Sequence, residues 1–321
     1  MAGNQVNNGK AFEYACLQSI YEALSISEPI SIIQSSQLDT ARSFFEELTP
    51  IEQDNMRNAA NAAFRVIDRL ETQLRYSQNN IPLCLTIQSD AEGMAGDVRD
   101  VVCLRRQNDW EIGISCKHNH KAVKHSRLSA TIDFGHEWLG YNCSRTYFND
   151  ITPIFSELEQ MRGTRRWSSI PDKAQRYYLP VLNAFLDELR RLAEAHQDVP
   201  RLLIQYLLGR FDFYKVISIE SNRITRVEAF NIAGSLNRSS GTHRSIVNMP
   251  RIHLPTCFYH IALRSDSETT AIVACDGGWE LSMRIHNAES MVIPSLKFDV
   301  QLISLPNTIY AESEPWDKTA P

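Results

Sequence analysis

The sequence has no long apolar run. No uninterrupted apolar stretch approaches the roughly 20 residues that a membrane-spanning helix needs, and the N-terminal residues MAGNQVNNGK are polar where a signal peptide would be apolar. The chain also lacks internal repeats and low-complexity tracts, and 43% of its 321 residues are hydrophobic and 22% charged. This composition excludes disordered, collagen-like and coiled-coil proteins. We therefore expect a cytoplasmic globular protein that forms a single compact unit.

The cysteines do not form the pattern of a disulfide framework. They are odd in number, widely scattered and mostly placed within apolar stretches. Secreted disulfide-rich domains instead carry an even number of cysteines in a short chain. We expect reduced, buried thiols at these positions, which are Cys16, Cys84, Cys103, Cys116, Cys143, Cys257 and Cys275.

Excess positive charge, which is typical of nucleic-acid-binding proteins, is also missing. The net charge is −5, but residues 1–55 contain eight acidic and two basic side chains, so the other 266 residues sum to +1. No acidic residue lies between Glu111 and Asp133. That interval predicts a local cationic patch whatever the net charge is. Its basic residues are Lys117, Lys121, Lys124 and Arg127, with His118, His120 and His125 among them.

Hydrophobic patterns divide the chain into three regions. Helical spacing of apolar residues predicts a helical region over 1–80, and residues 81–211 read as three short strands followed by helices. Residues 212–321 are rich in strands, and we expect them to contribute to DNA recognition. The fold class is therefore mixed α/β. The expected strands are 83–88, 101–104, 111–117, 213–219, 224–232, 258–264, 270–275, 279–285 and 297–305.

The second and third strands are expected to form a hairpin that turns near residues 107–109. Antiparallel pairing then places Leu104 opposite Glu111 and Asp100 opposite Ser115. Because side chains alternate along a strand, Glu111, Ser115 and Lys117 share one face. Such a site could hold a divalent cation through Asp100, with Lys117 orienting a water molecule or offsetting phosphate charge. A solvated polar face is the alternative interpretation.

Five sequence strings together resemble a known family. They are NNGKAFEYA at 7–15, GDVRDVV at 96–102, EIGISCKHNHKAVKHSRLS at 111–129, IDFGHEWLG at 132–140 and RIHNAESMVIPSLKFDVQLISLP at 284–306. The chain resembles type II restriction endonucleases of the PD-(D/E)xK superfamily, closest to the HaeIII-like group. The resemblance implies a mixed sheet flanked by helices, Mg²⁺-dependent hydrolysis of DNA phosphodiester bonds and a homodimer. The nearest group implies the double-stranded target GGCC, cut to blunt ends.

The resemblance also assigns roles to individual residues. The superfamily aspartate corresponds to Asp100, with Asp97 as the alternative ligand if a bulge shifts the strand. The superfamily lysine corresponds to Lys117. Ser115 departs from the pattern, because an acidic residue usually stands two positions before that lysine. We therefore treat Asp100, Lys117, Ser115 and Asp97 as candidate catalytic residues.

A carboxylate from another element must then replace the acid that is missing at Ser115. Glu13, in the string GKAFE, is the first candidate for this catalytic and metal-binding role, and Glu111 and Glu71 come after it. The alternative for Glu13 is an exposed acid near the start of a helix, where the helix dipole favours it.

Base recognition at a G·C target favours Arg or Lys on guanine. The acid-free string GSLNRSSGTHRS at 234–245 suits a mobile loop that becomes ordered on DNA. The DNA-binding candidates are Lys121, Lys124, His125, Arg127, Arg238, His243, Arg244, Arg284, Asn287 and Lys297. Two alternatives stay open: a non-catalytic or RNA-directed nucleic-acid-binding protein of the same fold, and a homologous nuclease with a different target.

Overall fold

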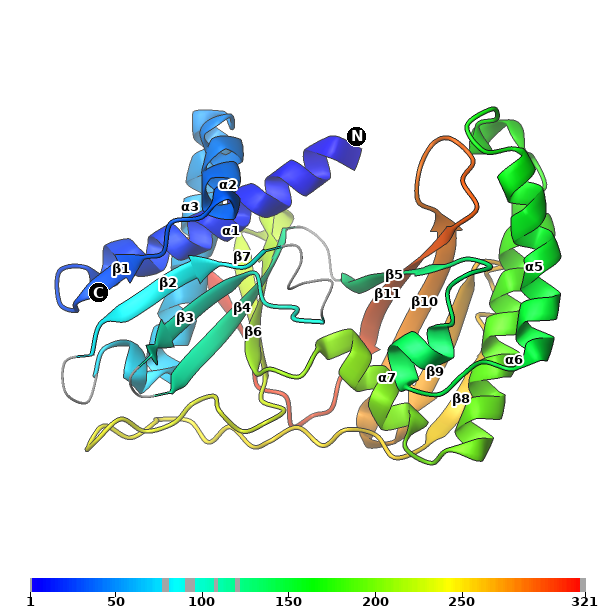
Figure 1. Ribbon diagram of the computed structural model, residues 1–321. Helices are drawn as coiled ribbons and strands as arrows, with labels where there is room; N and C mark the ends of the chain where they lie inside the picture. Colours follow the sequence, from blue (N-terminus) through cyan, green and yellow to red (C-terminus); the bar gives the residue numbers. More distant parts are fainter. Residues whose placement is uncertain (1, 77–80, 90–95, 107–108, 119–121, 318–321) are drawn as a thin grey trace. The chain divides into compact units, whose positions relative to one another are not determined.

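The computed structural model contains two compact units, each assembled from separate segments of the chain. Unit 1 comprises Met1–Lys121, Arg210–Ile252 and Asn307–Pro321, and unit 2 comprises Ala122–Gly209 and His253–Pro306. The structure describes residues 2–76, 81–89, 96–106, 109–118 and 122–317, without the side chains of 2–6 and 122–125. The sequence predicted one compact unit. Two units form because the chain builds two separate sheets, each with its own helices (Figure 1).

A mixed seven-stranded sheet forms the centre of unit 1. Its strand order is β1-β2-β3-β4-β6-β7-β12. The pairs β1–β2 and β4–β6 are parallel, and the other neighbours are antiparallel. This is the mixed α/β class that the sequence predicted. The strands are β1 (Ile30–Ile32), β2 (Leu83–Ile87), β3 (Val101–Arg105), β4 (Trp110–His118), β6 (Phe213–Ile219), β7 (Ile224–Phe230) and β12 (Ala311–Pro315).

The register predicted for the hairpin of β3 and β4 is confirmed. Leu104 pairs with Glu111, and Val102 pairs with Gly113. Beyond the last paired strand residues, the Asp100 amide donates to the Ile114 carbonyl at 2.8 Å, which continues the same register. The predicted turn includes residues 107–108, which lie outside the described residues.

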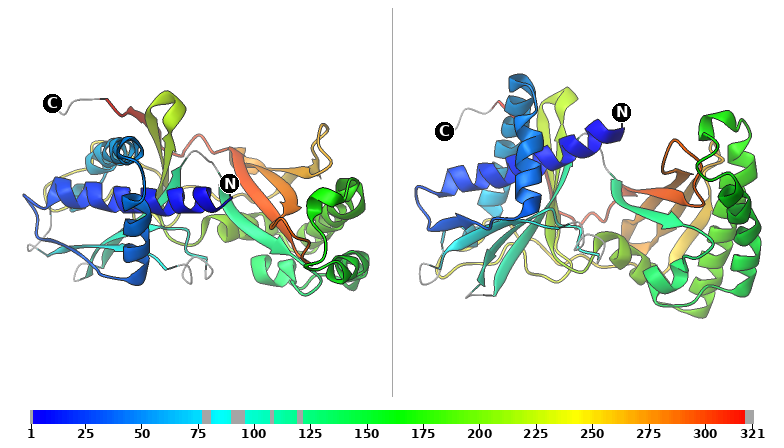
Figure 2. Two further views of the ribbon diagram at one scale, coloured as in Figure 1. Left: turned by 90° about the horizontal axis from the view of Figure 1, so that it is seen from above. Right: turned by 45° about the horizontal axis from the view of Figure 1, so that its top comes forward.

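Three helices pack on one face of this sheet. They are α1 (Ala2–Leu24), α2 (Ser36–Glu46) and α3 (Pro50–Leu70), and both views in Figure 2 show them gathered there. The N-terminus of α3 carries a capping box, in which Thr49 and Glu52 satisfy each other's backbone amides. Phe12 and Cys16 of α1 are buried in one core with the inward-facing β4 residues. Because this burial fixes α1 against β4, it also fixes the polar side chains at the edge of the contact.

Unit 2 contains an antiparallel five-stranded sheet with the order β5-β11-β10-β9-β8. Phe185 of α6 packs on Phe298 of β11 with ring centroids 4.9 Å apart, so α6 covers the apolar face of this sheet. The strands are β5 (Ala122–Leu128), β8 (Phe258–Leu263), β9 (Thr270–Cys275), β10 (Glu280–Asn287) and β11 (Leu296–Ser304). The longer helices are α5 (Arg145–Gln160), α6 (Leu179–Ala195) and α7 (Val199–Leu208), with shorter π turns at 135–139 and 174–178 and a 3₁₀ turn at 167–169.

The sequence analysis predicted most strands but missed three. β1 has only three residues and β12 has the polar sequence AESEP, and both are edge strands with one neighbour. β5 was interpreted only as a basic segment, because four of its seven residues are Lys, His, Ser or Arg. Its strand conformation depends on pairing with β11, which lies far away in the sequence. A local pattern cannot predict such a strand.

The cysteines and the helices bear on two further predictions. All seven cysteines are free, which confirms the prediction of reduced thiols. The predicted burial is wrong for Cys257, which is exposed, and Cys84 and Cys143 are only partly buried. Among the described residues, no helix combines the length and the apolar character that crossing a membrane requires.

A buried carboxyl group, Glu71, connects α3 to the sheet and to the loop after β7. Its Oε1 accepts hydrogen bonds from the Tyr214 hydroxyl at 2.6 Å and from the Asn237 amide at 2.7 Å. Its Oε2 has no hydrogen-bond partner among the described residues. Burial raises the pKa of Glu71 to about 7, although the hydrogen bonds from Tyr214 and Asn237 oppose that shift. The folded protein therefore favours the protonated form.

This raised pKa predicts that stability falls as pH rises. A pKa of about 7 in the folded state, above the ordinary glutamate value of 4.5, means that stability is lost as pH increases between those values. We expect urea denaturation to give a lower free energy of unfolding at high pH than at low pH, with Glu71→Gln reducing the difference. The exposed control Glu46→Gln should keep the parent's difference. An unchanged pH dependence in Glu71→Gln would contradict the prediction.

Candidate active site

Asp100 lies immediately before β3, where its backbone is held on both sides. Its amide donates to the Ile114 carbonyl at 2.8 Å, and its carbonyl accepts from the Gln88 amide at 2.9 Å. The residue is thus fixed between β2 and β4 although it is not itself part of a strand. A backbone held in this way places the side chain on a rigid part of the fold.

The Asp100 carboxylate contacts three polar groups at the end of β4. Its Oδ2 accepts from the Cys116 amide at 2.6 Å and lies 3.3 Å from Lys117 Nζ. The Ser115 hydroxyl donates to the same oxygen at 3.4 Å. The structure therefore brings together Asp100, Ser115 and Lys117, as the hairpin analysis expected. Lys117 and Asp100 keep part of their surface exposed, so a ligand can reach them.

Glu13 approaches this group from α1. It is buried, and its Oε2 lies 3.2 Å from Lys10 Nζ. Burial and the nearby Asp100 carboxylate raise the pKa of Glu13 to about 8, while Lys10 and Lys117 oppose the shift. Two carboxylates that repel each other in a desolvated place are stabilised by a bound cation. Glu13 is thus not the exposed first-turn acid of the alternative interpretation.

The structure places Asp97 and Glu111 in a different cluster. The buried Arg99 guanidinium binds Asp97 at 2.7 Å and Glu111 at 2.7 Å, and it lies over the Phe211 ring at 3.9 Å. Gly113 makes this possible, because a Cβ at that position would lie 1.9 Å from Arg99 Cδ. Both carboxylates bind Arg99, so neither joins Asp100 and Lys117.

The side chains of the site that could bind a divalent cation are carboxylates. Among the described residues, no three His, Cys, Asp or Glu side chains gather into a metal-binding group. What the site offers is two carboxylates, Asp100 and Glu13, with Lys117 beside them. Mg²⁺ typically binds one or two carboxylates and keeps several waters, so the set fits Mg²⁺ and does not fit a structural zinc ion.

Two lysines near the site were missed by the sequence analysis. Lys10 pairs with Glu13 three residues along α1, a spacing that the sequence already displays. Lys215 of β6 is buried and pairs in parallel register with Ser115. No sequence pattern indicates Lys215, because the adjacency of β4 and β6 depends on the tertiary fold.

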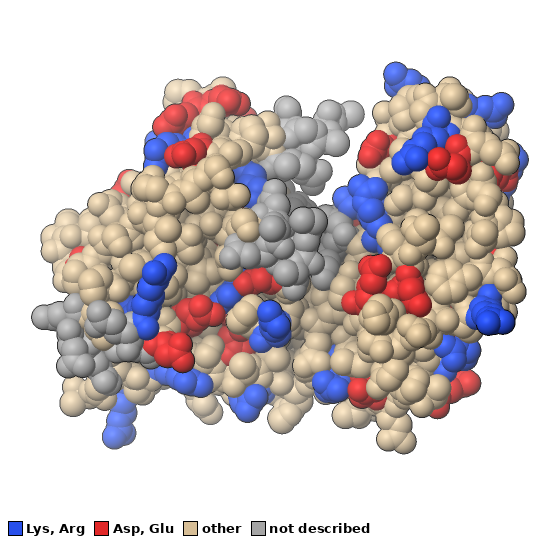
Figure 3. Space-filling view, viewed as in Figure 1, with Lys and Arg blue, Asp and Glu red and all other residues tan. Residues whose placement is uncertain are grey.

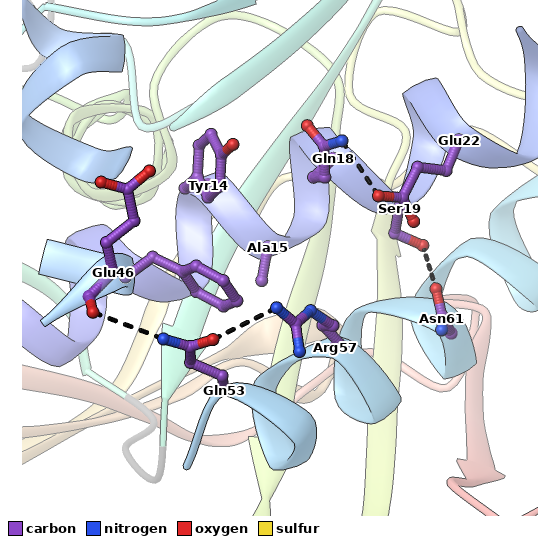
Figure 4. Close-up of a pocket in the computed structure, with 10 residues that line it drawn as sticks. Tyr14, Ala15, Gln18, Ser19, Glu22, Glu46, Gln53, Arg57 and Asn61 are labelled. Atoms are coloured by element: carbon purple, nitrogen blue, oxygen red, sulfur yellow. Dashed lines mark hydrogen bonds between the residues drawn. The ribbon is translucent and has the colours of Figure 1, made fainter. Parts of the chain in front are cut away.

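A separate pocket lies between α1, α2 and α3 (Figure 4). Its polar groups bind one another: Ser19 donates to Asn61 at 2.7 Å, and Arg57 donates to the Gln53 side chain at 3.2 Å. Gln53 in turn donates to the Glu46 carbonyl at 3.4 Å. Polar groups that satisfy one another are typical of helix packing, so this pocket offers no set of catalytic groups.

The loop expected to bind DNA in unit 1 is attached to the segment that follows α3. His243 stacks on Tyr76 with ring centroids 3.5 Å apart, and the Thr72 hydroxyl donates to the Arg238 carbonyl at 2.9 Å. Arg238 also donates through Nε to the Gly234 carbonyl at 2.9 Å. Arg244 is exposed. These contacts join the loop to the segment that follows α3, and its mobility and its ordering on DNA stay predictions.

The remaining DNA-binding candidates lie at the end of unit 1 or in unit 2. Lys121 lies outside the described residues, as do the side chains of Lys124 and His125. Asn287 faces the helices, where its side chain accepts from the Tyr178 hydroxyl at 3.0 Å and donates to the Glu289 carbonyl. Candidates Arg127, Arg284 and Lys297 belong to β5, β10 and β11.

Comparison with known proteins agrees with the resemblance seen in the motifs. Residues 9–306 match the family model described as HaeIII restriction endonuclease. The chain is 35% identical over 320 residues to the type II restriction enzyme HaeIII of Haemophilus aegyptius, which covers 99% of this chain and 100% of that protein. No solved structure matches the chain. The matches to the family model and to this relative extend over nearly the whole chain, and the chain therefore belongs to the HaeIII restriction endonuclease family.

Proposed function

We propose that this restriction endonuclease cuts double-stranded DNA at GGCC to blunt ends, by Mg²⁺-dependent hydrolysis at Asp100, Glu13 and Lys117. The observation that carries the catalytic assignment is the contact of the Asp100 carboxylate with Lys117 Nζ at 3.3 Å, beside the buried Glu13. Family membership supports a DNA substrate and a divalent metal. The GGCC target and the choice of Mg²⁺ rest on the family resemblance and on the oxygen donors of the site.

Each group has a distinct part in this proposal. Asp100 and Glu13 would hold the cation, with Glu13 in place of the acid that is missing at Ser115. A bound divalent cation would supply Lewis-acid stabilisation of charge on the phosphate. Lys117 would donate from its ammonium group to a phosphate oxygen or to the attacking water. Ser115 and the Cys116 amide would orient Asp100 by hydrogen bonding to its Oδ2.

Digestion of a plasmid of known sequence tests the function directly. We expect cleavage with Mg²⁺ or Mn²⁺, no cleavage with EDTA, and DNA binding without turnover in Ca²⁺, because the proposed ligands are oxygen atoms. Sequencing of the cut ends should place every break at the centre of GGCC. Full cleavage in EDTA would contradict the metal proposal, and breaks at another sequence would contradict the target.

Substitution of the site residues tests their roles. Asp100→Ala and Lys117→Ala should each lower the cleavage rate by about a thousandfold or more, while most DNA affinity stays, because both groups serve the reaction more than ground-state binding. Glu13→Gln should raise the Mg²⁺ concentration needed for half-maximal cleavage.

Glu111→Gln is the matched control, since Glu111 pairs with Arg99 away from Lys117. Cleavage rates and affinities of all variants are measured on one labelled GGCC duplex. Normal cleavage by Asp100→Ala, or loss of cleavage only in Glu111→Gln, would move the site to the Arg99 cluster.

We further propose that the active form is a homodimer. A palindromic duplex presents two equivalent scissile phosphates, and one site per chain matches them most simply in a two-fold symmetric dimer. Analytical ultracentrifugation with a short GGCC duplex should show two chains per duplex. One chain per duplex at saturating protein, with accumulation of nicked plasmid during digestion, would instead indicate a monomer that cuts the strands in turn.

A further inference from the structure

Charge does not mark a DNA-binding surface among the described residues on the face shown in Figure 3. Acidic and basic side chains are interspersed over the described residues on the face shown in Figure 3. Within unit 2, five arginines in or next to the helices are paired with carboxylates. These pairs are Arg162–Glu159, Arg176–Glu157, Arg190–Asp187, Arg191–Glu188 and Arg201–Asp198.

The second face of the unit 2 sheet is different. Burial alternates along β11, where Leu296, Phe298 and Val300 are buried and Lys297 and Asp299 are partly exposed. Phe298 faces α6 through its contact with Phe185, so the alternate residues point to the opposite face. An antiparallel sheet with one apolar and one polar face is covered on the apolar side.

Basic side chains line up across three strands on this polar face. Lys297 of β11 pairs with Arg127 of β5 on one side and with His286 of β10 on the other. Arg284 precedes His286 by two residues in β10, so it lies on the same face. Its partner in β11 is Asp299. We name this group the basic row; it consists of Arg127, Lys297, His286 and Arg284. Arg127 and Arg284 are exposed, and Lys297 and His286 are partly buried.

Three members of the basic row differ from these five arginines in their ion pairing. Arg127, Arg284 and Lys297 form no ion pair with a carboxylate among the described residues, and the contact of Arg127 is with the Ser295 hydroxyl at 3.5 Å. Asp299 is the acidic side chain that the registers place on this face beside Arg284. Partial burial and the neighbouring Arg127 lower the pKa of Lys297, with Asp299 opposing. Like charges directly opposite one another in a sheet are destabilising.

We propose that the basic row is a DNA-binding surface of unit 2 that contacts the phosphates or guanine edges of the duplex. The inference rests on the proposed function, because it assumes that DNA is the substrate. Arg and Lys bind phosphate oxygens and the O6 and N7 atoms of guanine, and β-ribbons are able to enter the major groove. The duplex supplies the negative charge that the row lacks, so a stability cost in the free protein is offset on binding.

Binding in EDTA tests the proposal without interference from cleavage. Fluorescence anisotropy of a labelled GGCC duplex is compared for the parent, Arg284→Ala, Lys297→Gln and the control Arg201→Ala, whose arginine lies on α7 in a pair with Asp198. We expect about tenfold weaker binding for each of the first two variants and parental binding for the control. For a phosphate contact, the slope of log affinity against log salt also falls by about 0.9.

Thermal unfolding separates a binding role from a structural one. Removing one of several like charges should leave the Tm of Lys297→Gln unchanged or raise it, while its affinity for DNA falls. Affinities of Arg284→Ala and Lys297→Gln within twofold of the parent would overturn the proposal. So would weaker binding that accompanies a lower Tm in both variants, or tighter binding of an RNA duplex of the same sequence.

The two proposals fail in different ways. If the parent does not cut DNA in Mg²⁺, the proposed function is contradicted. The affinity comparison in EDTA still decides whether the basic row binds the duplex.

Discussion

The hydrogen bond from the Cys116 amide to Asp100 Oδ2, at 2.6 Å, is the contact on which the candidate site depends. It connects Asp100, which precedes β3, to β4, a buried strand with a paired neighbour on each side. Because the backbone of Asp100 is also bonded to β2 and β4, its carboxylate has little freedom to turn away. Lys117 follows Cys116 in β4, and the regular strand therefore sets its position relative to Asp100.

Two clusters of charged side chains lie near the hairpin of β3 and β4. In one, the Arg99 guanidinium binds both Asp97 and Glu111. In the other, burial and the nearby Asp100 raise the pKa of Glu13, although Lys10 and Lys117 oppose the shift. A carboxylate pair left in this state favours cation binding.

The buried cation Arg105 of unit 1 and the basic row of unit 2 differ in their surroundings. In unit 1 the buried Arg105 guanidinium is surrounded by acceptors, among them the Gln73 and Leu74 carbonyls and the Glu28 carboxylate at 3.1 Å. This is what a stable interior requires of a buried cation. Among the described residues, Arg127, Arg284 and Lys297 of the basic row form no ion pair with a carboxylate and lie on a partly exposed sheet face, which favours binding an external polyanion over stabilising the fold.

The amino-acid sequence alone predicted the hairpin register, the reduced cysteines, most of the strands and the family, because these follow from alternation, residue type and motif strings along the chain. It also identified Asp100, Lys117 and Glu13 as candidates. It left open which aspartate joins the site, since Asp97 and Asp100 are close neighbours and only the position of Arg99 over Gly113 distinguishes them. The division into two units, the strand β5 and the orientation of Asn287 toward the helices were decided by the tertiary structure. Each depends on a partner distant in the sequence, and no local pattern contains that information.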